Sequence, residues 1–413
     1  MEYFDTYNSG YIAAYKTTHR AYKIRLELLD YFEGVIGEIT KDLSISATGQ
    51  ISVNRQQLTR RSINLTMINV DNKYVPSPNN PFWIERKFKV WLGVCNGEDI
   101  YWWSYGVFIT QDATSDGNTV TVTGIDKGGA LDGTLKTNML DATYTVKHGS
   151  SLTHMIRDAL LLTQEPDDYN VLYSASLKPI DPVPPVIDIG YNTVYTQADV
   201  NIESGSYLGE LFTSVADGYG ADVYYNTNGH LVLSEMADAI RIEGYNYMAR
   251  QWEFSADDSM YSGSNFEYAF SGINAVTVFT NVSEIGRENV SYTAYNNNPI
   301  SPMRVSLVGV RRMEAQEVSY VDVTPQEMTE KCRTYAEYLL LKESLVGMNV
   351  TFNAPILPHL DVGKTIGITD SKYGIESDTF VVQSITVPLS AGEMTITASN
   401  VTWLPNDKTK GVT

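Results

Sequence analysis

The chain has 413 residues, of which 43% are hydrophobic and 11% aromatic, and it carries a formal net charge of −19. This is the composition of a globular protein with two to four domains. The acidic balance argues against a duplex-binding protein, because affinity for DNA comes largely from cations that neutralise phosphates. No run approaches the roughly 18–20 apolar residues of a membrane span. Residues 1–9 are polar and acidic and differ from the basic start of a signal peptide, so we expect no membrane insertion by this chain.

Residues 1–20 show no clear periodicity and are expected to form an N-terminal arm, whereas residues 21–140 repeat short strand patterns. In Tyr22–Asp30, apolar and polar side chains alternate, as in a half-buried strand. Turn sequences such as Asp116-Gly117-Asn118 separate the strands. The spacing predicts a closed or nearly closed antiparallel β-barrel. Its expected strands are Tyr22–Asp30, Gly49–Asn54, Arg61–Asn69, Arg86–Trp91, Tyr101–Thr110 and Thr119–Asp126.

One of these strands, within residues 100–108, has no polar face. Tyr101, Trp103 and Tyr105 would point to one side of it and Trp102 to the other, because side chains alternate along a strand. Either this strand is buried on both sides within the chain, or it is a barrel wall whose outer face packs on another subunit or domain. In the second case, Tyr101, Trp103 and Tyr105 are the candidate interface residues.

Residues 141–250 predict a small α+β region. Apolar residues at helical spacing predict one helix within Leu152–Leu160 and a second within Leu208–Val215. After the second helix, Ala221–Asn226 and His230–Ser234 flank Asn228-Gly229. This dipeptide between two strand patterns predicts a hairpin with a type I′ turn.

Residues 251–413 return to the strand pattern, interrupted by one helix at residues 325–346. Thr324 and Glu327 form a capping box with Pro325 at the first helical position, and Cys332 lies on the apolar stripe that follows. The repeated pattern predicts a mainly β chain: two antiparallel barrels of similar strand order, separated by the α+β region, with this helix packed against the wall of the second barrel. The expected strands after Trp252 are Ala275–Thr280, Val290–Tyr295, Val305–Val308, Glu317–Val323, Gly347–Phe352, Thr365–Thr369, Thr379–Val387 and Glu393–Asn400.

Several segments, in their order along the chain, resemble the baseplate hub and tail-tip proteins of bacteriophages. The N-terminal halves of phage tail-associated lysins are similar. The resemblance covers about residues 20–403 and includes a LysM-like opening of the middle region at Tyr144–Ser151. The segments that resemble the family's two barrels are Arg60–Met67, Lys87–Gly93, Tyr105–Phe108, Val120–Asp126, Ile300–Pro302, Thr324–Glu343, Pro358–Gly363 and Ser384–Leu389.

The resemblance implies a homotrimer in which two hub-type barrels per chain alternate around an axis, as a pseudo-hexameric ring. Such a ring joins the tail tube, or a distal tail protein, to a three-fold spike or tip or to a tape-measure protein. DNA would be passing cargo only, and the protein would be part of the virion, assembled in the host cytoplasm. Tyr101, Trp103 and Tyr105 would then lie at a subunit or tube interface. Because the sequence ends soon after the last predicted strand, we expect no C-terminal hydrolase like that of the lysins.

The negative charge is unevenly spread along the chain. Residues 1–140 carry 14 basic and 15 acidic side chains, residues 141–250 carry 5 and 15, and residues 251–413 carry 11 and 19. The near-neutral first part is the expected place of tight protein contact, unless the difference is chance variation of a solvated surface. In a ring, the acidic remainder is expected in part to line the channel and so to repel passing DNA.

Catalytic and metal-binding motifs are absent from the sequence. It has no GxSxG, HExxH, CxxC or phosphate-cradling glycine motif, and its five histidines and two cysteines are scattered. We therefore expect no enzyme, no metal and no cofactor. Two alternatives stay open: a tail protein that binds carbohydrate through Trp102, Trp103 or Trp252, and a peptidoglycan hydrolase that uses carboxylates such as Asp257 and Asp258.

Overall fold

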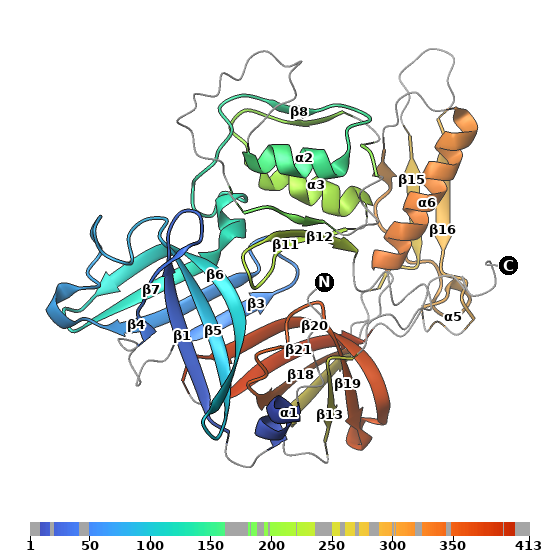
Figure 1. Ribbon diagram of the computed structural model, residues 1–413. Coiled ribbons are helices and arrows are strands. Elements are labelled where there is room, and N and C mark those ends of the chain that lie inside the picture. The colour runs from blue at the N-terminus through green and yellow to red at the C-terminus, as the bar shows by residue number, and fades with distance from the viewer. Residues whose placement is uncertain are drawn as a thin grey trace.

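The computed structural model contains two curved β-sheets and two smaller α+β units (Figure 1). The prediction of a mainly β chain with an α+β region between two β parts is confirmed. No helix in the described part of the chain is long and apolar enough to cross a membrane. The structure describes residues 9–16, 20–40, 49–161, 181, 183–187, 194–196, 199–219, 221–235, 250–256, 261–268, 272–280, 289–299, 301, 303–318, 324–343, 348–390 and 392–400.

The first curved sheet, which we call the first barrel, has the strand order β3-β4-β7-β6-β5-β1-β2, and all its neighbours are antiparallel. In β4, Ile63, Leu65 and Met67 are buried and alternate with more exposed residues, because successive side chains point to opposite faces. All six predicted strands are present, and β2 is an additional one. The bounds are β1 (Tyr22–Leu29), β2 (Val35–Glu38), β3 (Gln50–Asn54), β4 (Arg61–Ile68), β5 (Lys87–Asn96), β6 (Asp99–Ser115) and β7 (Thr119–Asp126).

The second barrel has the order β14-β18-β21-β20-β19-β13, which is the order of the first barrel strand for strand, without an equivalent of β2. The prediction of two barrels with a shared strand order is confirmed. One direction differs: β1 runs antiparallel to β5, whereas β13 runs parallel to β19. In the first barrel β2 reverses the direction of the chain between β1 and β3. Because β13 already runs opposite to the direction of β1, the second barrel needs no equivalent of β2. The bounds are β13 (Trp252–Ser255), β14 (Ser262–Tyr268), β18 (Met348–Pro355), β19 (Thr365–Asp370), β20 (Ile375–Pro388) and β21 (Glu393–Asn400).

The two barrels are joined edge to edge into one 13-stranded sheet. The first part of β20 pairs with β19, and its last five residues, Ser384–Pro388, pair antiparallel with β3. Val53 and Ile385 face each other in this joint, and both belong to one hydrophobic core that draws residues from both barrels. In the described part of the chain neither sheet closes on itself, so both are open barrels rather than the closed or nearly closed ones predicted.

Part of the expected N-terminal arm is helix α1 (Ser9–Lys16). Tyr11 and Ala14 of this helix are fully buried. The Tyr11 ring lies 4.2 Å from that of Trp103 in the first barrel, and its hydroxyl is 2.5 Å from Nδ1 of His359 in the second. The helix therefore packs between the two barrels.

The middle region has its own core, with α2 (Leu152–Leu161) and α3 (Gly209–Tyr219) packed between two small sheets (Figure 1). One sheet pairs β8 (Tyr144–Val146) with β10 (Val200–Ile202), and the other contains β11 (Ala221–Tyr225), β12 (Leu231–Glu235) and β9 (Val186–Ile187). The hairpin β11–β12 is where it was predicted, but its turn is not type I′. A type I′ turn needs positive φ at both central residues, and in this five-residue loop Gly229 alone has one, at 83°.

The second α+β unit lies between β14 and β18, where the first barrel has its β3–β4 turn. Its sheet has the order β16-β15-β17, and the predicted helix α6 (Pro325–Glu343) covers it. Cys332, Ala336 and Leu340 of α6 pack on Val276 and Val278 of β15. The prediction that this helix packs on the wall of the second barrel is therefore wrong, because the apolar stripe specified a buried face but not its partner. The bounds are β15 (Ala275–Phe279), β16 (Ser291–Tyr295) and β17 (Gln316–Glu317).

Two further strand predictions in this unit need correction. Val305–Val308, predicted as a strand, is the short helix α5. Of the predicted strand Glu317–Val323, only its start lies in β17, and residues 319–323 lie outside the described residues. The capping box is confirmed: the Thr324 amide donates to Glu327 at 2.8 Å and the Glu327 amide donates to Thr324 Oγ1 at 3.3 Å.

Candidate functional site at the junction of the barrels

Arg61 connects three parts of the molecule. It begins β4 and is fully buried. Its backbone amide donates to Asp126 Oδ2 at 2.8 Å, at the end of β7. Its guanidinium donates to the carbonyl of Tyr225 in the middle region at 2.7 Å and forms an ion pair with Asp361 of the second barrel.

Two more arginines of the β3–β4 loop bind the middle region next to Arg61. Asp222 of β11 forms ion pairs with both Arg60 and Arg55, the latter at 3.7 Å. The Arg60 guanidinium also lies over the Tyr224 ring, 4.0 Å from its centre. The Arg55 amide donates to the carbonyl of Gln383 in β20 at 2.9 Å. The β3–β4 loop of the first barrel thus contacts both the middle region and the second barrel.

The electrostatics of this junction follow from burial. Desolvation lowers the pKa of Arg61, but Asp361 and Asp126 outweigh it and the pKa is raised, so this guanidinium is charged. For Arg60, desolvation outweighs the attraction of Asp222, and the pKa is lowered. Burial also raises the pKa of Asp126 to about 6, against the opposing effect of Arg61. Buried ion pairs add little net stability but are costly to break, so these contacts chiefly fix how the parts are oriented.

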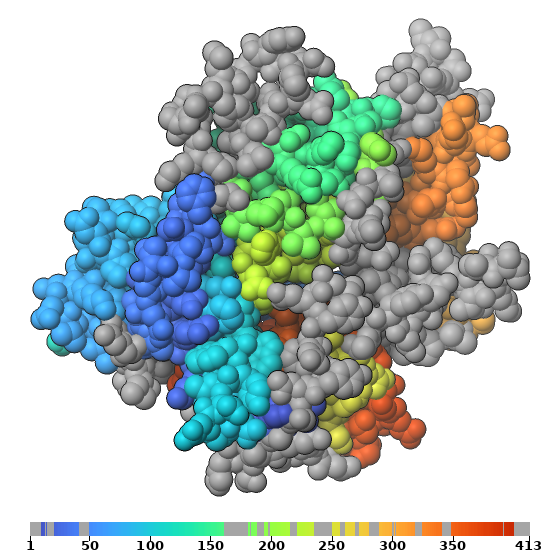
Figure 2. All heavy atoms as spheres, in the orientation of Figure 1, coloured from blue at the N-terminus to red at the C-terminus, as the bar shows by residue number. Residues whose placement is uncertain are grey.

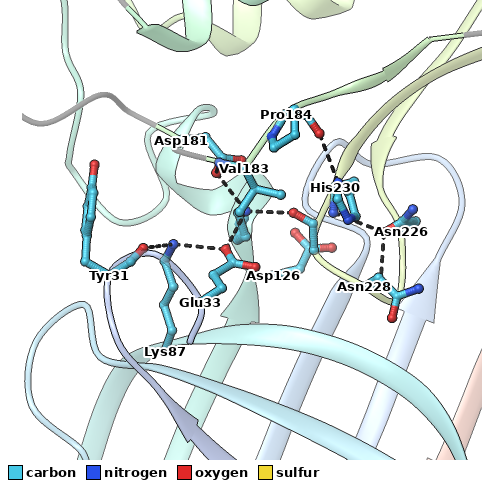
Figure 3. A network of polar contacts seen from close by, with 12 residues as sticks. Tyr31, Glu33, Lys87, Asp126, Asp181, Val183, Pro184, Asn226, Asn228 and His230 are labelled. Carbon is cyan, nitrogen blue, oxygen red and sulfur yellow. Dashed lines mark hydrogen bonds and ion pairs between the residues drawn. The ribbon is translucent and has the colours of Figure 1, made fainter. Parts of the chain in front are cut away.

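A second charged cluster lies where the β1–β2 turn meets the middle region (Figure 3). The buried Lys127 ammonium donates to Glu33 at 2.6 Å, to Asp181 at 2.9 Å and to the carbonyl of Gly229 at 2.6 Å. Lys87 donates to the same Glu33 carboxylate at 3.0 Å. The two cations thus share the Glu33 carboxylate of the first barrel, and Lys127 also binds a carboxylate and a carbonyl of the middle region.

The β11–β12 loop completes the contact by docking on the outside of β5 and β6. Ser104 of β6 donates to the carbonyl of Thr227 at 2.6 Å, and Lys89 of β5 donates to Asn228 at 3.1 Å. On the face shown in Figure 2, the yellow-green atoms of this hairpin abut the cyan atoms of β6. The middle region is therefore held on the first barrel by hydrogen bonds and buried charge.

The arrangement is suited to holding parts in place. In the described residues, the buried cations face carboxylates and carbonyls of the chain itself, and no group of three or more His, Cys, Asp or Glu side chains could hold a metal ion. Burial raises the pKa of the Cys332 thiol, which lies on the buried face of α6, as predicted. The site fixes the barrels relative to the middle region.

Three solved structures with a similar fold are tail proteins, two of them from prophages. A tail protein from Neisseria meningitidis MC58 matches with a TM-score of 0.58 and 13% identity, over 94% of this chain and 97% of that one. The 43 kDa tail protein of prophage MuSo2 from Shewanella oneidensis matches with a TM-score of 0.54 and 12% identity, over 92% and 98%. Prophage tail protein gp18 from Listeria monocytogenes EGD-e matches with a TM-score of 0.51 and 14% identity, over 92% and 94%.

The fold is that of phage tail proteins. At 12–14% identity the likeness concerns the fold alone. It extends over nearly the whole of both chains. No protein-family model matches the sequence, and a search of curated proteins finds no match.

Within the tail-protein fold, the three interface candidates lie against other parts of the same chain. Tyr105 is 3% exposed, and its pKa is raised by burial. Trp103 and Tyr101 are half-buried and pack on Tyr11 of α1, with ring centres 4.2 and 6.2 Å away. These residues therefore pack on the core shared by the two barrels, and a contact of these residues with a second subunit or a tube stays a prediction.

The residues of the charged junction were not predicted as a site. One signal for Arg61 was available, because it shares the inward face of β4 with Ile63 and Leu65. A charge at such a position needs a partner. The sequence did not indicate that the partners are Asp361 and Tyr225, which are far away along the chain.

Proposed function

We propose that the protein is a structural component of a phage-type tail: a homotrimeric baseplate hub or tail-tip adaptor that joins a hexameric tail tube to a three-fold spike or tip. The observation that carries this proposal is the edge-to-edge joint of two barrels with the same strand order. Three such chains in a closed ring contribute six barrels but only three middle regions. The barrels would then present six-fold repeats to a tube, and the other units three-fold repeats to a spike.

The partners follow from this symmetry. The barrels would contact the tail tube or a distal tail protein, and the opposite side would contact a spike, a tip or a tape-measure protein. DNA would pass through the ring without being bound, in keeping with the acidic charge of −19. The protein would be located in the virion after assembly in the host cytoplasm.

We further propose that the protein is not an enzyme. Of the three tryptophans considered as sugar platforms, Trp103 packs on Tyr11 and Trp252 lies 5.5 Å from the His359 ring. The third, Trp102, has the Arg25 guanidinium over its ring at 5.0 Å. Asp257 and Asp258 lie outside the described residues. Zymography on peptidoglycan and a glycan array test the two alternatives, and a clear signal in either would contradict this part of the proposal.

The test of the adaptor role is the mass of the purified protein in solution. Light scattering after size exclusion, or native mass spectrometry, should give three times the chain mass of 46.0 kDa. Class averages of the same sample by electron microscopy should show a ring with six-fold features on one face and three-fold features on the other. A protein that is monomeric at all accessible concentrations would contradict the proposal.

A further inference from the structure

Each strand of the joint between the two barrels has a counterpart in the other barrel that makes no such joint among the described residues. In this joint the end of β20 pairs with β3. The shared strand order makes β6 the equivalent of β20, and β14 the equivalent of β3. Among the described residues, β14 pairs with β18 alone, and the end of β6 pairs only with β7. The molecule therefore carries a second copy of each half of the joint, on opposite barrels.

The end of β6 resembles the end of β20 in detail. Each strand continues beyond the end of its outer neighbour, because β5 pairs with β6 only as far as Ile109, and β19 pairs with β20 only as far as Val381. Each also has a bulge at a glutamine, Gln111 in β6 and Gln383 in β20. A bulge bends a strand and increases its twist, so both strand ends are directed away from their own barrel in the same way.

The bulges also provide a common register. Starting one residue after the bulge, the paired residues across the first barrel are Asp112, Thr123, Asn64 and Gln50. The same path across the second barrel is Ser384, Thr397, Thr351 and Asn265. Gln50 of β3 therefore corresponds to Asn265 of β14.

We infer that the end of β6 in one copy of this chain pairs antiparallel with β14 of a second copy, which repeats between chains the joint that β20 and β3 make within one chain. In that joint Thr386 faces Ser52 and Val387 faces Ile51. The equivalent pairs between chains are Thr114 with Glu267 and Ser115 with Phe266. The surface is defined by Gln111–Ser115 on one copy and Asn265–Glu267 on the other.

The exposure of these residues agrees with the inference. Thr114 and Glu267 are exposed, as expected of strand edges that await a partner. Phe266 points inward and packs on Tyr373 at 4.4 Å, as Ile51 points into the shared core. The contact is heterologous, with two different surfaces, and such contacts close into a ring when their rotation fits a full turn. This inference rests on the proposed trimer and names the surface that would form it.

The test is a disulfide between chains. Residues directly opposite in an antiparallel pair have Cα atoms roughly 4.5–5.5 Å apart, which is within the range of a disulfide. The variant carries Thr114→Cys and Glu267→Cys in a Cys95→Ser background, and both positions are exposed, so folding should be unaffected. The matched control pairs Thr114→Cys with Glu38→Cys, an exposed position on the edge strand β2. After mild oxidation, non-reducing gels should show covalent dimers and trimers in at least tenfold excess over the control.

The outcomes separate this inference from the proposed function. If the protein is a trimer but the first variant cross-links no more than the control, the inferred strand pairing is wrong and the proposed adaptor role is not contradicted. Covalent dimers without trimers would also overturn it, because they indicate a contact that closes on two copies. A monomer under all conditions would overturn both the inference and the proposed trimer.

Discussion

Arg61 and Tyr225 are joined by a hydrogen bond of 2.7 Å, from a guanidinium nitrogen of the first barrel to a backbone carbonyl of the middle region. The same guanidinium forms an ion pair with Asp361 of the second barrel. One fully buried side chain thus fixes three parts of the fold. The proposed adaptor, which would present six-fold and three-fold surfaces together, requires such a fixed relation.

Removing this guanidinium should destabilise the whole chain. In Arg61→Met, the Tyr225 carbonyl and the Asp361 carboxylate lose their partner, and breaking a buried pair costs about 3–5 kcal/mol. Urea unfolding should show this loss. The control is Arg333→Ala, whose ion pairs lie on the exposed face of α6 and should matter little. Equal midpoints for the two variants would contradict the role assigned to Arg61.

The β11–β12 loop offers a test of the docking contact. Gly229 has a φ of 83°, and a Cβ there would lie 2.8 Å from Glu33 and 2.9 Å from Val107. Gly229→Ala should therefore cost backbone strain of about 1 kcal/mol and additional free energy from the clash. Gly149→Ala is the control, because its φ is 79° and nothing lies within 4 Å of its Cβ. Hydrogen exchange in β11–β12 should increase for the first variant only.

Substitutions on α6 should act on the second α+β unit. Leu339 is 7% exposed in the core that α6 forms with β15 and β16, so Leu339→Asp buries an unpaired carboxylate and should cost several kcal/mol. Glu337→Ala removes only a surface ion pair with Arg333 and should cost about 1 kcal/mol or less. Thermal melts compare the two variants. Similar melting temperatures would mean that the buried face of the helix is assigned incorrectly.

The contact between α1 and the second barrel should depend on pH. Burial lowers the pKa of His359 from 6.5 to about 4. Because the unfolded chain binds this proton more readily, its neutral form contributes stability above pH 6.5, and this contribution is lost as the pH falls toward 4. Between pH 7 and pH 5 the loss should be about 2 kcal/mol. The midpoint of urea unfolding should change less between pH 7 and pH 5 in His359→Gln than in the native chain. An equal change in both proteins would show that His359 does not cause the pH dependence.

The buried face of β4 and the start of α6 follow from local patterns. Alternation in β4 identifies Ile63, Leu65 and Met67 as the buried face, and the capping box at Thr324 marks where α6 begins. These features depend on residues a few positions apart, so the sequence determines them directly. The likeness of the two barrels was also visible as a repeated spacing of strands, and the structure confirms it as a shared strand order.

The contacts that build the candidate site were decided by the tertiary structure. The apolar stripe of α6 fits any apolar surface of the right shape, and only the folded chain shows that β15 and β16 cover it. Periodicity likewise indicates that Arg61 points inward, but not that Asp361, 300 positions away, faces it. The sequence by itself determined which faces are buried, because that depends on near neighbours. Which distant faces meet depends on the path of the whole chain, and that is where the joint of the barrels and the charged junction arise.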